Sequence, residues 1–169
     1  MDRLWSPWRL AYITGTGQAT GCVFCTAVEA ADAAPLIVYR GTTCFIILNL
    51  FPYNSGHLMV VPNRHVASLA AATPAELAEL IELTRRCEVA LTEAYAPHGI
   101  NMGVNLGKPA GAGVLDHVHM HVVPRWNGDT NFMTVVGETR VLPEELPVTG
   151  DRLRPIFEWL ATGDRPGPE

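Results

Sequence analysis

The sequence predicts an α+β fold with an antiparallel sheet of about five strands, one long helix and a short C-terminal helix. Short apolar runs alternate with clusters of glycine, proline and asparagine, as in strands joined by turns. One longer stretch carries apolar residues at helical spacing behind a helix-start signal. The strand-like runs follow one another with a single long helix among them, unlike the regular alternation of βαβ folds.

Five strands are expected, and turn residues bound several of them. Gly41 separates the first two runs and suits a tight antiparallel connection. Pro62 closes the third run, because proline has no N–H to donate to a sheet. The expected strands span residues 36–40, 42–48, 57–62, 100–106 and 114–123.

The clearest helix is expected between Thr73 and Pro97. Thr73 fits the N-cap, and Pro74 fits the first helical position, where no N–H is needed. Glu76 completes a capping box, and apolar residues then recur at helical spacing.

Length and composition fit one domain. The chain has 169 residues, of which 48% are hydrophobic, enough for a sizeable core. We expect a single domain over residues 1–161, with its short terminal helix at residues 151–160. Residues 162–169 are rich in glycine, proline and charge, and we expect them to form a flexible tail.

Charge and hydropathy limit the classes of partner. A net charge of -5 disfavours a protein that binds duplex nucleic acid by neutralising phosphates over a broad surface. It leaves room for a single nucleotide in a local pocket. No stretch reaches the ~20 apolar residues needed to cross a bilayer, and Arg3, Pro7 and Arg9 interrupt any signal peptide. The sequence therefore predicts no membrane segment and a cytoplasmic location.

Three of the six histidines alternate along the last expected strand, as His117, His119 and His121. On a strand these side chains share one face, with neighbours roughly 6 to 7 Å apart. One or two histidines there could be ordinary residues of a solvated face. Three such histidines occupy positions where β-branched or aromatic residues would stabilise a strand better. Each also titrates near neutrality, so the row favours a functional role.

Cys22 and Cys25 form a CxxC pair among four cysteines, too few for a disulfide scaffold. Two thiolates at this spacing can hold one tetrahedral metal with two further ligands, for which His65 and His117 are the candidates. Zinc bound by four protein ligands would be structural. The alternatives are a redox pair, which usually begins a helix in a βαβ unit, or two ordinary small residues.

Residues 99–113 contain five glycines just ahead of the histidine row. Glycine lets backbone amides approach an anion, so this loop, with Gly111 and Gly113, is a candidate phosphate cradle. A flexible hairpin is an equal alternative, and the spacing is not that of a P-loop. His57, directly after Gly56, fits either a nucleotide contact or a histidine at a strand start.

The run His117-Val-His119-Met-His121-Val-Val resembles the histidine-triad motif of the HIT superfamily of nucleotide-binding hydrolases and transferases. Residues 110–113 and 125–132 are similar to a bacterial branch associated with diadenosine tetraphosphate hydrolases or phosphorylases. The resemblance extends over residues 20–125 and includes the Cys22–Cys25 pair, Asn49, Gly56-His57, Pro62-Asn-Arg-His65, Asn105 and Val123-Pro124-Arg125.

The resemblance implies a HIT-like fold and a role for each triad member. His119 would attack the α-phosphorus of a nucleotide and form a covalent nucleotidyl-histidine, since a neutral imidazole is a good nucleophile. His121 would hydrogen-bond the phosphate and help protonate the leaving group, and His117 would orient the row. Asn105 would contact the phosphate and Asn49 the ribose.

The zinc-carrying members of the superfamily imply a metal site made of Cys22, Cys25, His65 and His117, and the related proteins imply a homodimer. The leading hypothesis is an enzyme that cleaves dinucleoside polyphosphates or related phosphoanhydrides, with water or inorganic phosphate as acceptor. A nucleotide-binding sensor with little turnover is the alternative from another class. A catalytic metal held by the three histidines is a third, weakened because no nearby carboxylate stands in the usual place for a metal ligand.

Overall fold

The computed structural model describes residues 21–30, 34–129 and 144–165. It confirms the α+β fold, with one five-stranded sheet in this part of the chain. The elements in chain order are α2 (Val23–Glu29), β1 (Ile37–Arg40), β2 (Cys44–Leu48), β3 (Leu58–Pro62), the 3₁₀ turn η2 (Leu69–Ala71), α3 (Pro74–Tyr95), β4 (Gly99–Val104), the 3₁₀ turn η3 (Lys108–Ala110), β5 (Met120–Arg125) and α5 (Leu146–Thr162).

The sheet has the strand order β1-β2-β3-β5-β4, and each neighbouring pair is antiparallel. The last strand in the chain, β5, therefore lies between β3 and β4. Its His121 faces Met59 on β3 and Gly103 on β4. This insertion carries the end of the histidine row into the interior of the sheet.

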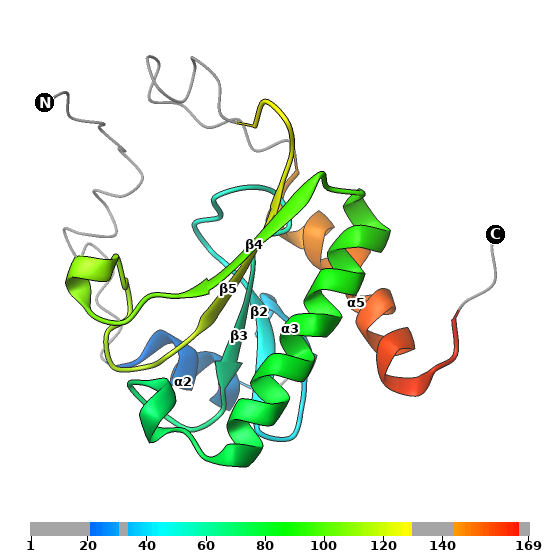
Figure 1. Ribbon diagram of the computed structural model, residues 1–169. Helices are drawn as coiled ribbons and strands as arrows, with labels where there is room; N and C mark the ends of the chain where they lie inside the picture. The colour runs from blue at the N-terminus through cyan, green and yellow to red at the C-terminus, as the bar shows by residue number, and fades with distance from the viewer. Residues whose placement is uncertain (1–20, 31–33, 130–143, 166–169) are drawn as a thin grey trace, which may run out of the picture.

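Both faces of the neighbouring strands β2 and β3 are covered, and every residue in them is buried. Alternate side chains enter two separate cores. One core, which includes Ile46 and Val60, packs against α3 and α5; the other, which includes Phe45 and Met59, packs against Phe24 of α2. Figure 1 shows α3 and α5 on one side of the sheet and α2 on the other. Double-sided burial explains why these strands are continuous apolar runs.

The expected capping box at the start of α3 is present. The Thr73 side chain accepts from the Glu76 N–H (3.2 Å), and the Glu76 carboxylate accepts from the Thr73 N–H (2.7 Å). Arg64 also donates to both oxygens of this carboxylate, from Nε at 2.9 Å and Nη2 at 2.8 Å. The helix ends where Ala96 turns to a left-handed conformation with φ 43°.

The last strand begins later than residue 114, because β5 starts at Met120. Its partner β4 ends at Val104, opposite Met120, so the preceding stretch has no strand on that side. The stretch instead bonds to the loop after β3, where the Val118 N–H donates to the Val66 carbonyl at 2.7 Å. His117 and His119 thus precede the strand, and only His121 lies on it.

Two helices differ from the expectations. The terminal helix begins at Leu146 instead of residue 151, since Pro147 in its first turn needs no hydrogen-bond acceptor, and it extends through residue 162 of the expected tail. The short helix α2 was not expected at all; Cys22 is its N-cap. The tryptophans at positions 5 and 8 and residues 166–169 of the expected tail lie outside the described residues.

Among the helices of the described segments, none has both the length and the apolar character that spanning a bilayer requires.

Replacing Glu76 by glutamine should weaken the fold in a pH-dependent way. The Arg64 guanidinium, followed by the Thr73 N–H, lowers the pKa of Glu76 from its ordinary 4.5 to about 2. A depressed carboxyl pKa contributes stability above the ordinary value, and that stability is lost as pH falls towards the folded value. The urea midpoint of Glu76→Gln should therefore lie below the native one near neutral pH, and the gap should shrink between pH 4.5 and about 2.

Glu82→Gln is the matched control, because Glu82 lies on the same helix and also pairs with arginine, but its side chain is 42% exposed. An exposed pair contributes little, so its gap should be much smaller. An equal gap for the two variants would show that the capping-box carboxylate has no special role.

Candidate active site

The triad region and β3 bring three histidines to the α2 side of the sheet. His121 pairs with Met59, so these two side chains share a face. His57 precedes Met59 by two residues and continues on that face. The rings of His119 and His121 lie 4.7 Å apart, and those of His57 and His121 5.2 Å apart.

Hydrogen bonds assign the protons of the His57–His121 pair. The Tyr53 N–H donates to Nδ1 of His57 at 3.1 Å, and the Asn49 amide lies 3.3 Å from the same nitrogen. Nδ1 is therefore a lone-pair acceptor, and the ring proton lies on Nε2. Since Nε2 of His57 is 3.0 Å from Nδ1 of His121, it donates there. His121 then carries its own proton on Nε2.

The His119 ring has the opposite assignment. Its Nδ1 is 2.9 Å from the His117 carbonyl oxygen, so Nδ1 holds the proton and donates. Nε2 is left with a lone pair. In the described part of the chain no hydrogen bond reaches this nitrogen. The ring lies against Phe24 (5.0 Å between centroids) and His121, and His119 is only 4% exposed.

Burial keeps the triad neutral. It lowers the pKa of His117 and of His119 below the ordinary 6.5, against the opposing effect of their backbone hydrogen bonds. Burial, and then the proximity of His119, lowers the pKa of His121 to about 4. At neutral pH the site therefore offers one imidazole lone pair, on His119, beside one imidazole N–H, on His121.

Gly56 allows the His57 region to pack closely on the sheet and α3. Its φ is +79°, and a Cβ added there would lie 3.0 Å from Leu91 and 3.1 Å from Tyr95. Both the backbone conformation and the space thus favour glycine. This explains the glycine directly ahead of a buried histidine that is only 1% exposed.

The four expected metal ligands converge. The ligand atoms of Cys22, Cys25, His65 and His117 all lie within 4.8 Å of one another. Cys22 Sγ is 3.2 Å from His117 Nδ1, and Cys25 Sγ is 3.3 Å from His65 Nδ1. A tetrahedral zinc with bonds of about 2.0–2.3 Å places neighbouring donors about 3.3–3.8 Å apart. Three sulfur–nitrogen separations in the cluster, 3.2, 3.3 and 3.7 Å, lie within or close to this range.

The tautomer of His117 also fits a metal. Its Nε2 is 2.8 Å from the Pro62 carbonyl oxygen and donates to it, which leaves the Nδ1 lone pair facing the cysteines. Ligating histidines usually donate their second N–H in this way. The redox alternative fits less well, because burial and the neighbouring Cys22 raise the pKa of the Cys25 thiol, whereas a reactive cysteine has a lowered one.

Two backbone N–H groups of the glycine-rich loop are already hydrogen-bonded within the loop, whereas a phosphate cradle needs such groups free to bind an anion. In the loop's 3₁₀ turn the Gly111 N–H donates to Lys108, and the Ala112 N–H donates to Gly107. Gly107 and Gly111 have positive φ, whereas Gly113 does not. The Asn105 amide lies beside Gly111, 3.9 Å from where its Cβ would be. The Gly111 amide is thus already bonded within the loop.

Two side chains at the site were not identified from the sequence. Phe24 lies between the two cysteines, and its ring contacts both His117 (5.4 Å) and His119. Tyr53 lies 4.7 Å from the His57 ring and 6.0 Å from the His121 ring. The position of Phe24 inside the CxxC pair was a signal that could have placed it at the site. Nothing in the local sequence distinguishes Tyr53.

The sequence matches the HIT domain over residues 31–128. The chain belongs to the HIT domain family. It is 40% identical over 167 residues to AP-4-A phosphorylase of Mycobacterium tuberculosis (strain ATCC 25618 / H37Rv), across 94% of this chain and 85% of that protein. It is 33% identical over 93 residues to bis(5'-nucleosyl)-tetraphosphatase [asymmetrical] of Schizosaccharomyces pombe (strain 972 / ATCC 24843), across 55% of this chain and 50% of that protein. These matches confirm the family resemblance seen in the histidine row.

A solved structure supports the fold. The zinc-bound histidine triad family protein from Mycobacterium smegmatis has a TM-score of 0.69 and 30% sequence identity to this chain, over 85% of this chain and 98% of that one.

Proposed function

We propose that this HIT protein cleaves dinucleoside polyphosphates by nucleotidyl transfer through His119. The observation that carries the proposal is the pair of opposite tautomers: a lone pair on Nε2 of His119 next to a ring that carries a proton on Nε2 of His121. The polyphosphate substrate is supported by the names of the two enzymes in the family to which the chain is similar. A site for binding alone needs donors but no nucleophile.

The reaction divides into two displacements. The Nε2 lone pair of His119 attacks the α-phosphorus, and the bond from that phosphorus to the bridging oxygen breaks. The His121 Nε2–H donates to the phosphate and helps to protonate the leaving nucleotide. An acceptor then attacks the same phosphorus and returns its proton to Nε2 of His121, the P–N bond breaks, and His119 recovers its lone pair. Two steps replace one difficult displacement.

We propose inorganic phosphate as the acceptor. The 40% identical relative, which spans 94% of this chain, is named a phosphorylase, whereas the relative named a tetraphosphatase covers only 55% of it. With diadenosine tetraphosphate, phosphorolysis yields ADP plus ATP, and asymmetric hydrolysis yields AMP plus ATP. Asn49, Asn105 and Gly113 remain the proposed nucleotide contacts, whereas the Gly111 N–H and both ring nitrogens of His57 already bond within the protein.

His119→Ala should lower turnover of diadenosine tetraphosphate by on the order of 10⁴-fold or more, because the nucleophile is lost, while nucleotide binding stays measurable. Products are identified by mass spectrometry with and without inorganic phosphate. His98→Ala is the matched control, since His98 is an exposed histidine whose Nδ1 only accepts from the Asn127 N–H. Equal turnover in His119→Ala would remove His119 from its role, and binding without turnover in the native protein would favour the sensor.

We propose that Cys22, Cys25, His65 and His117 hold a structural zinc ion. When bound, it would supply no catalytic water, because four protein ligands leave no open position. His117 then has two tasks: its ring holds the metal, and its carbonyl accepts from His119. The purified protein should contain about one zinc per chain by elemental analysis. Cys25→Ser should lose most of it, whereas Cys87→Ala, which alters a buried cysteine outside the cluster, should keep it. Full zinc content in Cys25→Ser would refute this ligand set.

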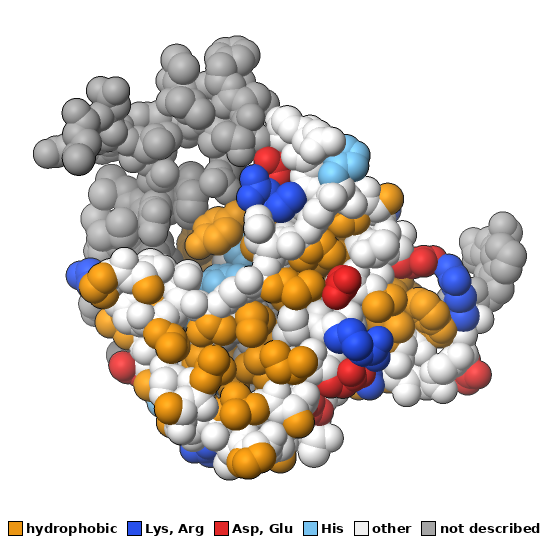
Figure 2. Space-filling view, in the orientation of Figure 1, with side chains coloured by type: hydrophobic (Ala, Val, Ile, Leu, Met, Phe, Trp, Pro, Cys, Tyr) orange, Lys and Arg blue, Asp and Glu red, His pale blue; other side chains and the backbone are white. Residues whose placement is uncertain are grey.

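We propose a homodimer that forms along β4, which among the described strands has a sheet neighbour on one side only. Met102 pairs with Val122, whose side chain packs towards α3, and Met102 is nevertheless 42% exposed. Figure 2 shows hydrophobic side chains gathered on the face over β4 and the first half of α3. An exposed strand edge with an apolar flank is suited to pairing with a second copy.

Met102→Asp should therefore reduce the mass in sedimentation equilibrium to about half. Val148→Asp changes a similarly exposed apolar residue, 48% exposed on α5, and should leave the dimer intact. A native protein that sediments as a monomer, or a dimer that Met102→Asp leaves unchanged, would contradict the β4 interface.

We also propose that residues 1–161 form one domain followed by a flexible tail, and that the protein resides in the cytoplasm. The location is supported by the cysteine pair, because zinc-binding thiols persist where the compartment is reducing.

A further inference from the structure

The end of β3 and the loop after it support both the metal site and the triad. The Pro62 carbonyl accepts from Nε2 of His117, and the Val66 carbonyl accepts from the Val118 N–H. Between them lies His65, a proposed zinc ligand. Residues 63–68 form neither helix nor strand. Their order therefore depends on what their side chains and peptide groups bind.

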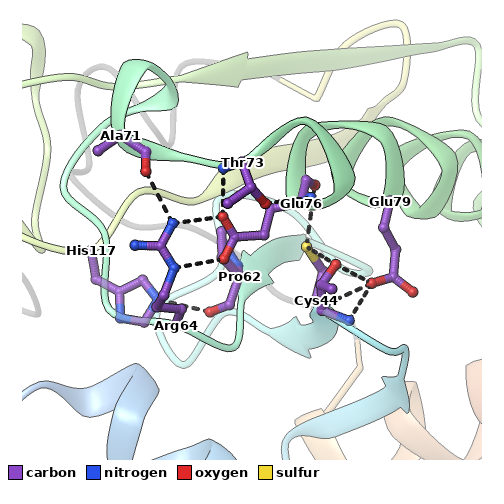
Figure 3. Close-up of polar contacts among 9 residues, drawn as sticks. Cys44, Pro62, Arg64, Ala71, Thr73, Glu76, Glu79 and His117 are labelled. Atoms are coloured by element: carbon purple, nitrogen blue, oxygen red, sulfur yellow. Dashed lines mark hydrogen bonds and ion pairs between the residues drawn. The ribbon is translucent and has the colours of Figure 1, made fainter.

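The Arg64 side chain extends from this loop towards Ala71 and towards Glu76 at the start of α3, as Figure 3 shows. Its Nε and Nη2 donate to the two oxygens of Glu76, and Nη2 also donates to the Ala71 carbonyl at 3.0 Å. The Glu76 side chain is 7% exposed and is held from its other side by the Thr73 N–H. A guanidinium in bidentate contact with a fixed carboxylate restricts the position of the arginine more than a single hydrogen bond does.

We propose that Arg64 is a positioning residue for the zinc site. By clamping the loop to the first turn of α3, it fixes His65 for the ion, while the Pro62 carbonyl is held by the pairing of β3 with β2. The inference rests on the proposed zinc site. It extends that site to a side chain that touches neither metal nor substrate.

Most ion pairs on this helix differ from the Arg64–Glu76 pair. Arg85 and Glu82, for example, are 58% and 42% exposed and belong to the same helix, so their pairing restrains no loop. The Arg64–Glu76 pair connects two separate segments through a buried carboxylate. Loss of this pair should therefore weaken zinc binding, because the loop that it restrains carries the ligand His65.

The loop has a second attachment, which limits the expected effect. The Asn63 N–H donates to the Thr43 carbonyl at 2.7 Å, and its side chain donates to the Thr42 carbonyl at 3.1 Å. Loss of Arg64 should loosen the loop without releasing it. Groups that orient metal ligands are worth about 10- to 100-fold in metal affinity, and an effect near the lower end is expected.

The test is zinc affinity of the full chain by competition with a chromophoric chelator. Arg64→Ala should weaken zinc binding roughly tenfold. Glu76→Gln should match it, because glutamine can still accept from the Thr73 N–H but cannot pair with the guanidinium as a carboxylate does. The double variant should be no weaker than either single one, since both remove the same pair. Arg64→Lys, which keeps the charge without the fork, should fall between native and Arg64→Ala. Arg85→Ala should match the native protein.

The outcomes separate the two proposals. A native protein without zinc would overturn both the metal site and the role of Arg64. Native zinc binding that Arg64→Ala and Glu76→Gln leave unchanged would overturn the role of Arg64 alone, even if their urea midpoints fall, because that pattern indicates a purely structural pair. If Arg64→Ala does not fold, Glu76→Gln and Arg64→Lys decide the question by the same criterion.

Discussion

The proposed chemistry of the site depends on one hydrogen bond, the donation from Nδ1 of His119 to the carbonyl of His117. A neutral imidazole has a single N–H, so fixing the proton on Nδ1 leaves the lone pair on Nε2. If the proton were on Nε2, His119 would be a donor there and could not act as the proposed nucleophile. The acceptor is a peptide carbonyl of the residue whose ring faces the cysteines. The reactivity of one histidine is therefore tied to the placement of another.

The sheet provides the rigid support for this arrangement. Because β5 lies between β3 and β4, His121 is held on both sides, and β3 brings His57 to its Nδ1. The second core on the α2 side then shields the rings from water, which lowers their pKa values and keeps them uncharged. The packing of this hydrophobic face therefore also keeps the histidines of the site uncharged.

Local patterns in the sequence were sufficient for much of the fold. The capping box at Thr73 and Glu76 gave the long helix because its signal lies within four residues, and the apolar runs gave all five strands. The start of β5 could not be predicted in this way. It depends on where β4 ends, a pairing between distant segments. Likewise, the extent of the terminal helix depended on a proline that is favourable only in a first turn.

The candidate site, too, could be predicted only where its signal lies within a short stretch of sequence. The spacing of His117, His119 and His121, and of the two cysteines, could be read directly, and these residues do meet. The sequence placed the three histidines on a regular strand, whereas two of them lie ahead of it and are almost fully buried. The proton assignments came from the carbonyls of His117 and Pro62 and from the Tyr53 N–H. Backbone groups of this kind are identical in every residue type, so no sequence pattern reveals them.

The helix α2 has only seven residues and no side-chain hydrogen bond at its N-cap. A helix of that length is not stable on its own in water. It is therefore held in place by the Phe24 ring, buried against the histidines, and by the two thiols that flank this ring. Of the helices packed around the sheet, it should be among the first to open in native-state hydrogen exchange, and each opening would hydrate the imidazole of His119.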